Sequence, residues 1–176
     1  MAGVGALLLV APAVIDPRPR LIWNASASVP IGLYRARGVA DLALGDLVAV
    51  EPPADLAAFL SDRGYLPRGV PLLKHVAALA GSVVCRDGTA VRVDGRPAAV
   101  ARPADSRDRP LPTWSGCRTI AAGEVFLLNP EAVDSFDGRY FGPLPRDAVT
   151  ARLAPIWIAA NPLDPRPPGV PDASEP

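Results

Sequence analysis

The chain has 176 residues, of which 49% are hydrophobic, so it can bury one core and is not globally disordered. Its 18 basic and 18 acidic residues cancel, which excludes a large basic surface and argues against nucleic-acid binding. The 22 prolines disfavour a helical bundle, because proline breaks helices and central strands, and they favour short strands joined by turns.

The two ends of the chain differ from its middle. Residues 2–15 carry no charge, but they are fewer than the roughly 20 residues that a spanning helix needs. We expect a membrane anchor or signal-like segment at residues 1–16; a truncated anchor, a cleaved signal peptide and a buried strand or helix are the alternatives. Residues 161–176 are rich in proline and lack apolar periodicity, which predicts a disordered tail. A single domain at residues 17–160 remains.

The first predicted elements of this domain lie between residues 44 and 80. A turn signal and a short apolar run predict a strand within residues 44–50. Apolar residues at Leu56, Phe59 and Leu60, followed by Gly64, predict one short helix over residues 54–63. Residues 72–80 are apolar almost throughout, and their pattern fits a helix or a strand equally well.

The second half of the domain is predicted to consist of strands. Residues 82–85, 89–93 and 98–100 are β-rich and are separated by turn signals at 86–88 and 94–95, as in a meander. A polar, proline-rich excursion over residues 102–116 follows, and then strands at 124–128 and 149–158. The fold class is therefore mainly β, with coiled antiparallel sheets or a small open barrel and one short helix.

The chain contains two cysteines and one histidine, which limits its chemistry. Cys85 and Cys117 fit neither a metal-binding signature nor a Cys-x-x-Cys motif, and the single His75 excludes a histidine-rich metal site. We expect no metal and no other cofactor. If the domain lies beyond an inner membrane, we expect Cys85 and Cys117 to form a disulfide; two small buried thiols are the alternative.

Residues 24–34 contain a candidate nucleophile. Pro30 restricts the residue before it to extended conformations, and Gly32 permits a sharp turn. Ser28 lies just before this bend, where a nucleophile's backbone N–H can face a reacting carbonyl. In an extended segment Ser26 would point to the same side and could supply a second, hydroxyl donor. An ordinary turn without catalytic function is the alternative.

Lys74 is the only lysine, and it lies within the apolar residues 71–80. A serine nucleophile needs a base, and a lysine can serve once burial lowers its pKa. A surface lysine that only extends its amine to solvent is the alternative. His75 would point to the opposite face of a strand from Lys74, so we interpret it as structural.

Residues 134–143 form a third polar stretch. If this segment is extended, Ser135, Asp137 and Arg139 lie on one side, where the carboxylate and the guanidinium can pair. A hydroxyl such as that of Ser135 could orient a neutral lysine. A polar turn with a weak surface ion pair is the alternative.

Together these stretches resemble the TraF-type peptidases of conjugative transfer, a branch of the type I signal peptidase group of serine-lysine proteases. The resemblance covers about residues 1–160 and rests on Asn24-x-Ser-x-Ser-Val-Pro-x-Gly-x-Tyr34, on Leu73-Lys-His-Val-Ala-Ala-Leu-Ala-Gly81 and on Ser135-Phe-Asp-Gly-Arg-Tyr-Phe-Gly142, in the family's order. Pro30 stands one residue earlier than in housekeeping signal peptidases, which favours the TraF branch.

The resemblance implies roles for these residues. Ser28 would be the nucleophile, Lys74 the general base and Ser26 the oxyanion-hole hydroxyl. Asp137 and Arg139 would support the site, and Ser135 would contact Lys74.

The implied function is cleavage of an exported pilin-type precursor at the periplasmic side of a bacterial inner membrane, together with other conjugative transfer proteins. A general type I signal peptidase and a non-catalytic assembly component are the alternatives.

Overall fold

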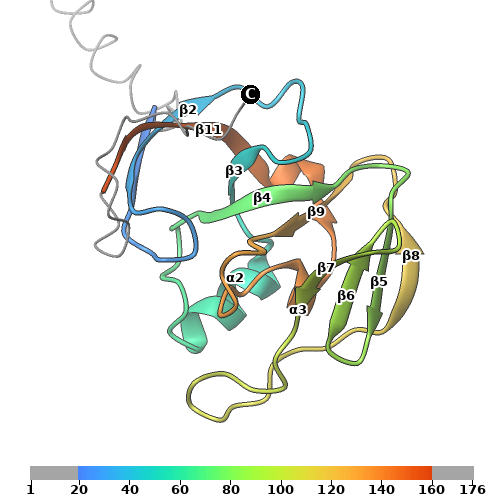
Figure 1. Ribbon diagram of the computed structural model, residues 1–176. Helices are drawn as coiled ribbons and strands as arrows, with labels where there is room; N and C mark the ends of the chain where they lie inside the picture. The colour runs from blue at the N-terminus through green and yellow to red at the C-terminus, as the bar shows by residue number, and fades with distance from the viewer. Residues whose placement is uncertain (1–19, 160–176) are drawn as a thin grey trace, which may run out of the picture.

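The computed structural model describes residues 20–159, which form two antiparallel β-sheets and little helix (Figure 1). The larger sheet is curled and has the strand order β1-β2-β11-β3-β4-β9-β10, with β1 (Leu21–Asn24), β2 (Gly32–Arg37), β3 (Leu47–Val50), β4 (Leu72–Ala78), β9 (Glu124–Leu128), β10 (Leu144–Pro145) and β11 (Val149–Ile158). The mainly β fold expected from the sequence is confirmed. The predicted segments 1–16 and 161–176 lie outside the described residues.

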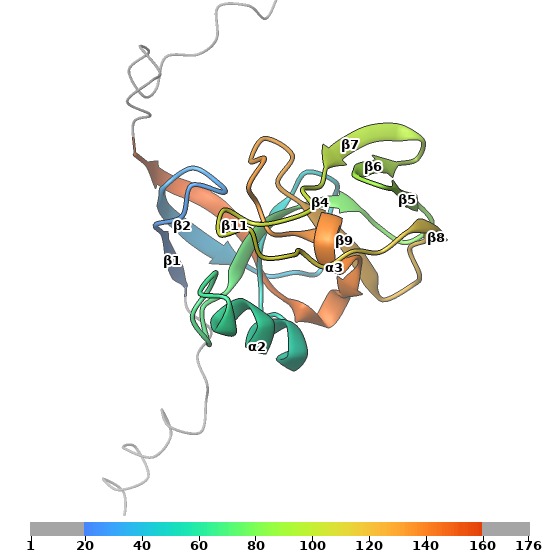
Figure 2. The ribbon, with the colours of Figure 1, turned by 90° about the horizontal axis from the view of Figure 1, so that it is seen from below.

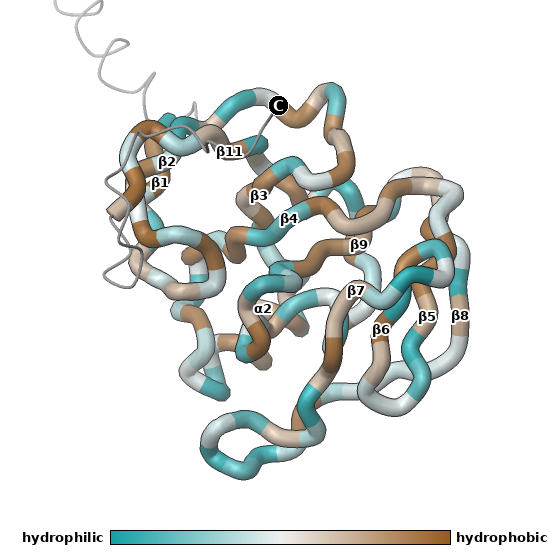
Figure 3. Tube along the Cα trace, in the orientation of Figure 1, coloured by the Kyte–Doolittle hydropathy of each residue, from teal (hydrophilic) through white to brown (hydrophobic). Residues whose placement is uncertain are grey.

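The centre of the larger sheet forms the core. Strand β4 pairs with β3 on one side and β9 on the other, and neighbouring elements cover both faces. This explains its nearly continuous apolar sequence, which left helix and strand undecided. Val48, Val76 and Leu127 on these central strands are almost completely buried, and Figure 3 shows hydrophobic colour on β3 and β9.

Helix α2 (Ala54–Asp62) lies below the larger sheet in Figures 1 and 2. Its apolar residues follow the helical spacing predicted from the sequence, and Leu60 is 1% exposed. Gly64 follows with a φ of +69°, a conformation that glycine adopts without strain and that ends the helix. Within residues 20–159, no helix is both long enough and apolar enough to cross a membrane.

The smaller sheet stands to one side and has the order β7-β6-β5-β8 (Figure 2), with β5 (Val83–Asp87), β6 (Ala90–Val93), β7 (Arg96–Val100) and β8 (Gly116–Thr119). Cys85 and Cys117 lie directly opposite each other on β5 and β8 and are joined by a disulfide with an S–S distance of 2.05 Å. The disulfide holds the end of the proline-rich excursion against the sheet.

Residues 134–143 are not extended throughout, unlike the arrangement considered from the sequence. Gly138–Phe141 form a short second helix, α3, and Arg146–Ala148 form a 3-10 turn, η1. The side chain of Asp137 accepts a hydrogen bond from the backbone N–H of Arg139 and so caps α3. Gly138 has to be glycine, because a Cβ atom there would lie 2.7 Å from the Leu127 carbonyl oxygen.

Candidate active site

The candidate nucleophile Ser28 lies in the turn between β1 and β2. The two strands pair up to Asn24 and Gly32, and residues 25–31 connect them. Gly32 also permits β2 to pair closely with β11, because a Cβ atom there would lie 2.2 Å from the Trp157 carbonyl oxygen of β11. The turn, which replaces the extended segment considered above, brings Ser26 Oγ within 3.1 Å of Ser28 Oγ.

Ser28 and its surroundings offer hydrogen-bond donors to a substrate. The Ser28 side chain is partly buried, whereas Ser26 is exposed. Across residues 20–159, the backbone N–H of Ser28 makes no hydrogen bond, so it is available to a ligand. The Ser28 N–H and the Ser26 hydroxyl are thus two hydrogen-bond donors close to the candidate nucleophile.

Lys74 is the third residue of β4, and it is 3% exposed despite its charge. Its Nζ donates a hydrogen bond of 2.8 Å to Ser135 Oγ, which is equally buried. Burial lowers the pKa of Lys74 from 10.5 to about 8; the Asp137 carboxylate raises the pKa and the Arg139 guanidinium lowers it. A substantial fraction of Lys74 is therefore neutral in mildly alkaline solution.

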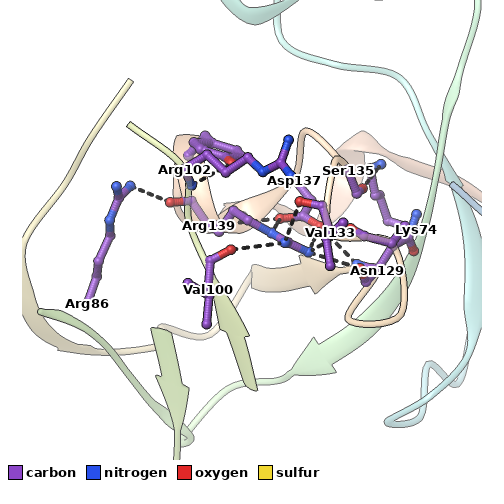
Figure 4. Close-up of polar contacts among 12 residues, drawn as sticks. Lys74, Arg86, Val100, Arg102, Asn129, Val133, Ser135, Asp137 and Arg139 are labelled. Atoms are coloured by element: carbon purple, nitrogen blue, oxygen red, sulfur yellow. Dashed lines mark hydrogen bonds and ion pairs between the residues drawn. The ribbon is translucent and has the colours of Figure 1, made fainter. Parts of the chain in front are cut away.

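Asp137 and Arg139 form a buried ion pair to one side of Ser135 (Figure 4). Arg139 Nε and Nη2 donate to the two carboxylate oxygens of Asp137 at 2.8 and 3.0 Å. The guanidinium also donates to the backbone carbonyls of Val100, Asn129, Ala132 and Val133. The pair is thus fully hydrogen-bonded, unlike the weak surface pair that was the alternative, and it fixes the turn that carries Ser135.

Asn129 connects this pair to β4. Its backbone N–H donates to Asp137 Oδ2 at 2.9 Å, and its side-chain Nδ2 donates to the Leu73 carbonyl oxygen at 3.0 Å. Its Oδ1 lies 3.0 Å from Nδ1 of His75, which faces away from Lys74 as the alternation of a strand predicts. No sequence pattern predicts a role for Asn129 or for Asn24, which is buried beside Ser26.

The ion pair gives a testable effect on stability. Asp137→Ala would leave the Arg139 charge buried and unpaired, so we expect it to lower the free energy of unfolding by about 3–5 kcal/mol. Asp134→Ala is the matched control, because Asp134 pairs with Arg102 at the surface and its side chain is 73% exposed. Urea unfolding of the full chain measures both variants. Equal, small losses would contradict the supporting role assigned to the buried pair.

One cavity of about 710 Å³ connects these groups. Its wall includes Ser26, Ser28, Lys74 and Ser135, which come from two distant parts of the larger sheet and from the turn before α3. Asp137 and Arg139 do not line the cavity and lie behind it. Most of the remaining wall is apolar. Within the described part of the chain, no group of three or more His, Cys, Asp or Glu side chains could hold a metal ion.

Comparison with known proteins identifies the family. Residues 1–158 match the family described as signal peptidase, peptidase S26. The chain belongs to this family. Membership implies a serine peptidase. A solved structure of signal peptidase I from Enterococcus faecalis is 19% identical, with a TM-score of 0.40 over 66% of this chain and all of that one.

Named relatives resemble the chain over most of its length. It is 34% identical to a plasmid transfer protein TraF of Escherichia coli, over 89% of this chain and 91% of the relative. It is 39% identical to a probable conjugal transfer protein TraF of Sinorhizobium fredii, over 72% and 71%. A conjugal transfer protein TraF of Agrobacterium fabrum is 32% identical over 88% and 92%. These similarities agree with the family resemblance seen in the sequence.

Proposed function

We propose that this S26 peptidase is a membrane-associated endopeptidase that processes an exported pilin-type precursor in a conjugative transfer system. The observation that carries the proposal is the buried Lys74, with a pKa near 8, in the wall of the same cavity as Ser28. The family membership supports proteolysis, and the TraF relatives support the conjugative system.

The first half of the proposed reaction forms an acyl-enzyme. Neutral Lys74 takes the proton of Ser28 Oγ, and the oxygen attacks the carbonyl carbon of the scissile peptide bond. The backbone N–H of Ser28 and the hydroxyl of Ser26 donate to the resulting oxyanion. When the C–N bond breaks, protonated Lys74 gives its proton to the leaving amine. Substrate must bring Ser28 Oγ within reach of Lys74 Nζ, because the free structure has no hydrogen bond between them.

The second half of the reaction releases the product. Lys74, neutral again, takes a proton from water as the water oxygen attacks the ester carbonyl, and Ser28 Oγ leaves with the proton from Lys74. A peptide amine in place of water would close the pilin into a circle. The buried Ser135 hydroxyl accepts a hydrogen bond from Nζ throughout and so directs the lone pair of the neutral amine away from itself.

The proposed location is the bacterial inner membrane, with the catalytic domain on the periplasmic side and other transfer proteins as partners. An exposed apolar cluster at one end of the larger sheet supports a position at a membrane. The rings of Trp23 and Trp157 stack with centroids 5.8 Å apart and are each more than half exposed, next to the exposed Leu21 and Ile156. Tryptophan is enriched at membrane–water interfaces.

The test is the mass of the pilin in a host that carries the conjugative system. We expect full-length precursor in a strain without this chain, and mature pilin when the full chain is restored. Restoring Ser28→Ala should leave the precursor. Shortening of many unrelated preproteins would instead identify a general signal peptidase, and mature pilin with Ser28→Ala would identify an assembly component.

A further inference from the structure

Asn24 is the most highly connected side chain of the turn that carries Ser28. It ends strand β1 and is 6% exposed. Its Nδ2 donates to the carbonyl oxygens of Ser26, Val29 and Pro30 at 2.8, 3.0 and 3.1 Å. Two amide hydrogens are thus shared among three carbonyls on both sides of Ser28, and they fix the path of the backbone through the nucleophile.

The side-chain oxygen of Asn24 binds Ser26 through two hydrogen bonds. Asn24 Oδ1 accepts hydrogen bonds from the backbone N–H of Ser26 at 3.0 Å and from Ser26 Oγ at 2.9 Å. A serine hydroxyl has a single hydrogen. When Ser26 gives this hydrogen to Asn24 Oδ1, Ser28 Oγ has to be the donor in the 3.1 Å contact between the two hydroxyls. Asn24 therefore determines which atom near Ser26 accepts the Ser26 hydrogen.

We propose that Asn24 is a positioning residue that aims the two oxyanion donors, the Ser26 hydroxyl and the Ser28 N–H, at the reacting carbonyl. The inference rests on the proposed function, in which these groups hold the oxyanion. It assigns a role in transition-state stabilisation to a side chain that does not itself touch the oxyanion.

The geometry explains how the Ser26 hydroxyl can be released at low cost. When charge develops on the substrate oxygen, the Ser26 hydrogen turns from Asn24 Oδ1 toward the stronger, charged acceptor. Asn24 Oδ1 keeps its bond from the backbone N–H of Ser26, so no buried acceptor is left unpaired. Meanwhile the three bonds from Nδ2 keep the turn fixed, which preserves the direction of the Ser28 N–H.

The experiment measures kcat and KM of the full chain, in detergent, for cleavage of the purified pilin precursor. Removing one oxyanion donor lowers kcat by about 10²–10³ in known serine proteases, so we expect Asn24→Ala to lower kcat by about tenfold or more with KM nearly unchanged. In a Ser26→Ala background the same substitution should cost much less, because its main target is gone. Asn24→Asp keeps the volume and the acceptor, but its charge would retain the Ser26 hydrogen, and its second oxygen cannot replace the three hydrogen bonds from Nδ2. We therefore expect kcat to fall with and without Ser26, and to fall further when Ser26 is present.

Tyr34→Phe is the matched structural control. Tyr34 is 2% exposed, and its hydroxyl donates to the Pro30 carbonyl, which Asn24 also binds, but it does not contact Ser26. We expect it to lower the thermal unfolding midpoint while kcat falls much less than in Asn24→Ala. Asn24 variants with full kcat, or with an equal loss with and without Ser26, would overturn the inference, provided that Ser28→Ala is inactive. Should Ser28→Ala still cleave, the proposed function itself fails.

Discussion

Ser28→Ala and Lys74→Ala should each lower kcat for precursor cleavage by about 10⁴–10⁶, the loss seen when a member of a serine protease's catalytic unit is removed. Each residue is useless without the other in the proposed mechanism, because the hydroxyl needs a base and the base needs a proton to accept. The double variant should therefore be no slower than either single variant.

The measurement is single-turnover cleavage of the pilin precursor by the full chain. Ser115→Ala is the matched control, since Ser115 is exposed and does not line the cavity. Circular dichroism of every variant shows whether the fold persists. Losses that multiply in the double variant would mean that Ser28 and Lys74 act independently, and the dyad would have to be abandoned.

The parts of the fold predicted from sequence are those with a strong local signal. Strands β9 and β11 have the predicted bounds, and α2 ends one residue before its predicted end. By contrast, the sequence does not predict β8: only its first residue lies in the predicted polar excursion over residues 102–116, and its four residues are all exposed and show no apolar pattern. Its place in the sheet depends on pairing with β5 and on the disulfide to Cys85, both of which are long-range.

In the candidate site, too, the residues with a local sequence signal were predictable, and those that depend on long-range contacts were not. The sequence supplied Ser28, Lys74 and Ser135, and the structure places all three at one cavity although residues 28 and 135 are far apart in the chain. Helix α3 was not predicted, since one turn of helix depends on its cap and on close packing against β9 rather than on periodicity. The roles of Asn24 and Asn129 consist of hydrogen bonds to backbone groups, and no side-chain pattern in the sequence reports such contacts.

The burial of strand β4 accounts for the low pKa of Lys74. Lys74 is opposite Val48 of β3 and lies within a mostly buried strand, so its charged form loses hydration that Ser135 alone cannot replace. Asp137 favours the charged form and Arg139 disfavours it, and their mutual pairing reduces both effects. Burial thus dominates the pKa of Lys74.

The pH dependence of cleavage should follow from this shift. The neutral form of Lys74 is the base, so kcat should rise about tenfold per pH unit below its pKa near 8 and level off above it. In the unfolded chain the same lysine would titrate near 10.4. Initial rates from pH 6 to pH 10 at saturating precursor give the profile. A rate that stays flat across pH 8 would show that Lys74 does not lose a proton before the chemical step.

Lys74→Arg tests whether residue 74 acts as a proton acceptor or only as a positive charge. An arginine keeps a positive charge in the same strand but does not release its proton at working pH, so we expect it to be as inactive as Lys74→Ala. Because Lys74 is the only lysine of the chain, no other lysine can take over the role. Near-normal turnover by Lys74→Arg, measured on the same precursor, would mean that the site needs only a cation there, and the general-base assignment would be withdrawn.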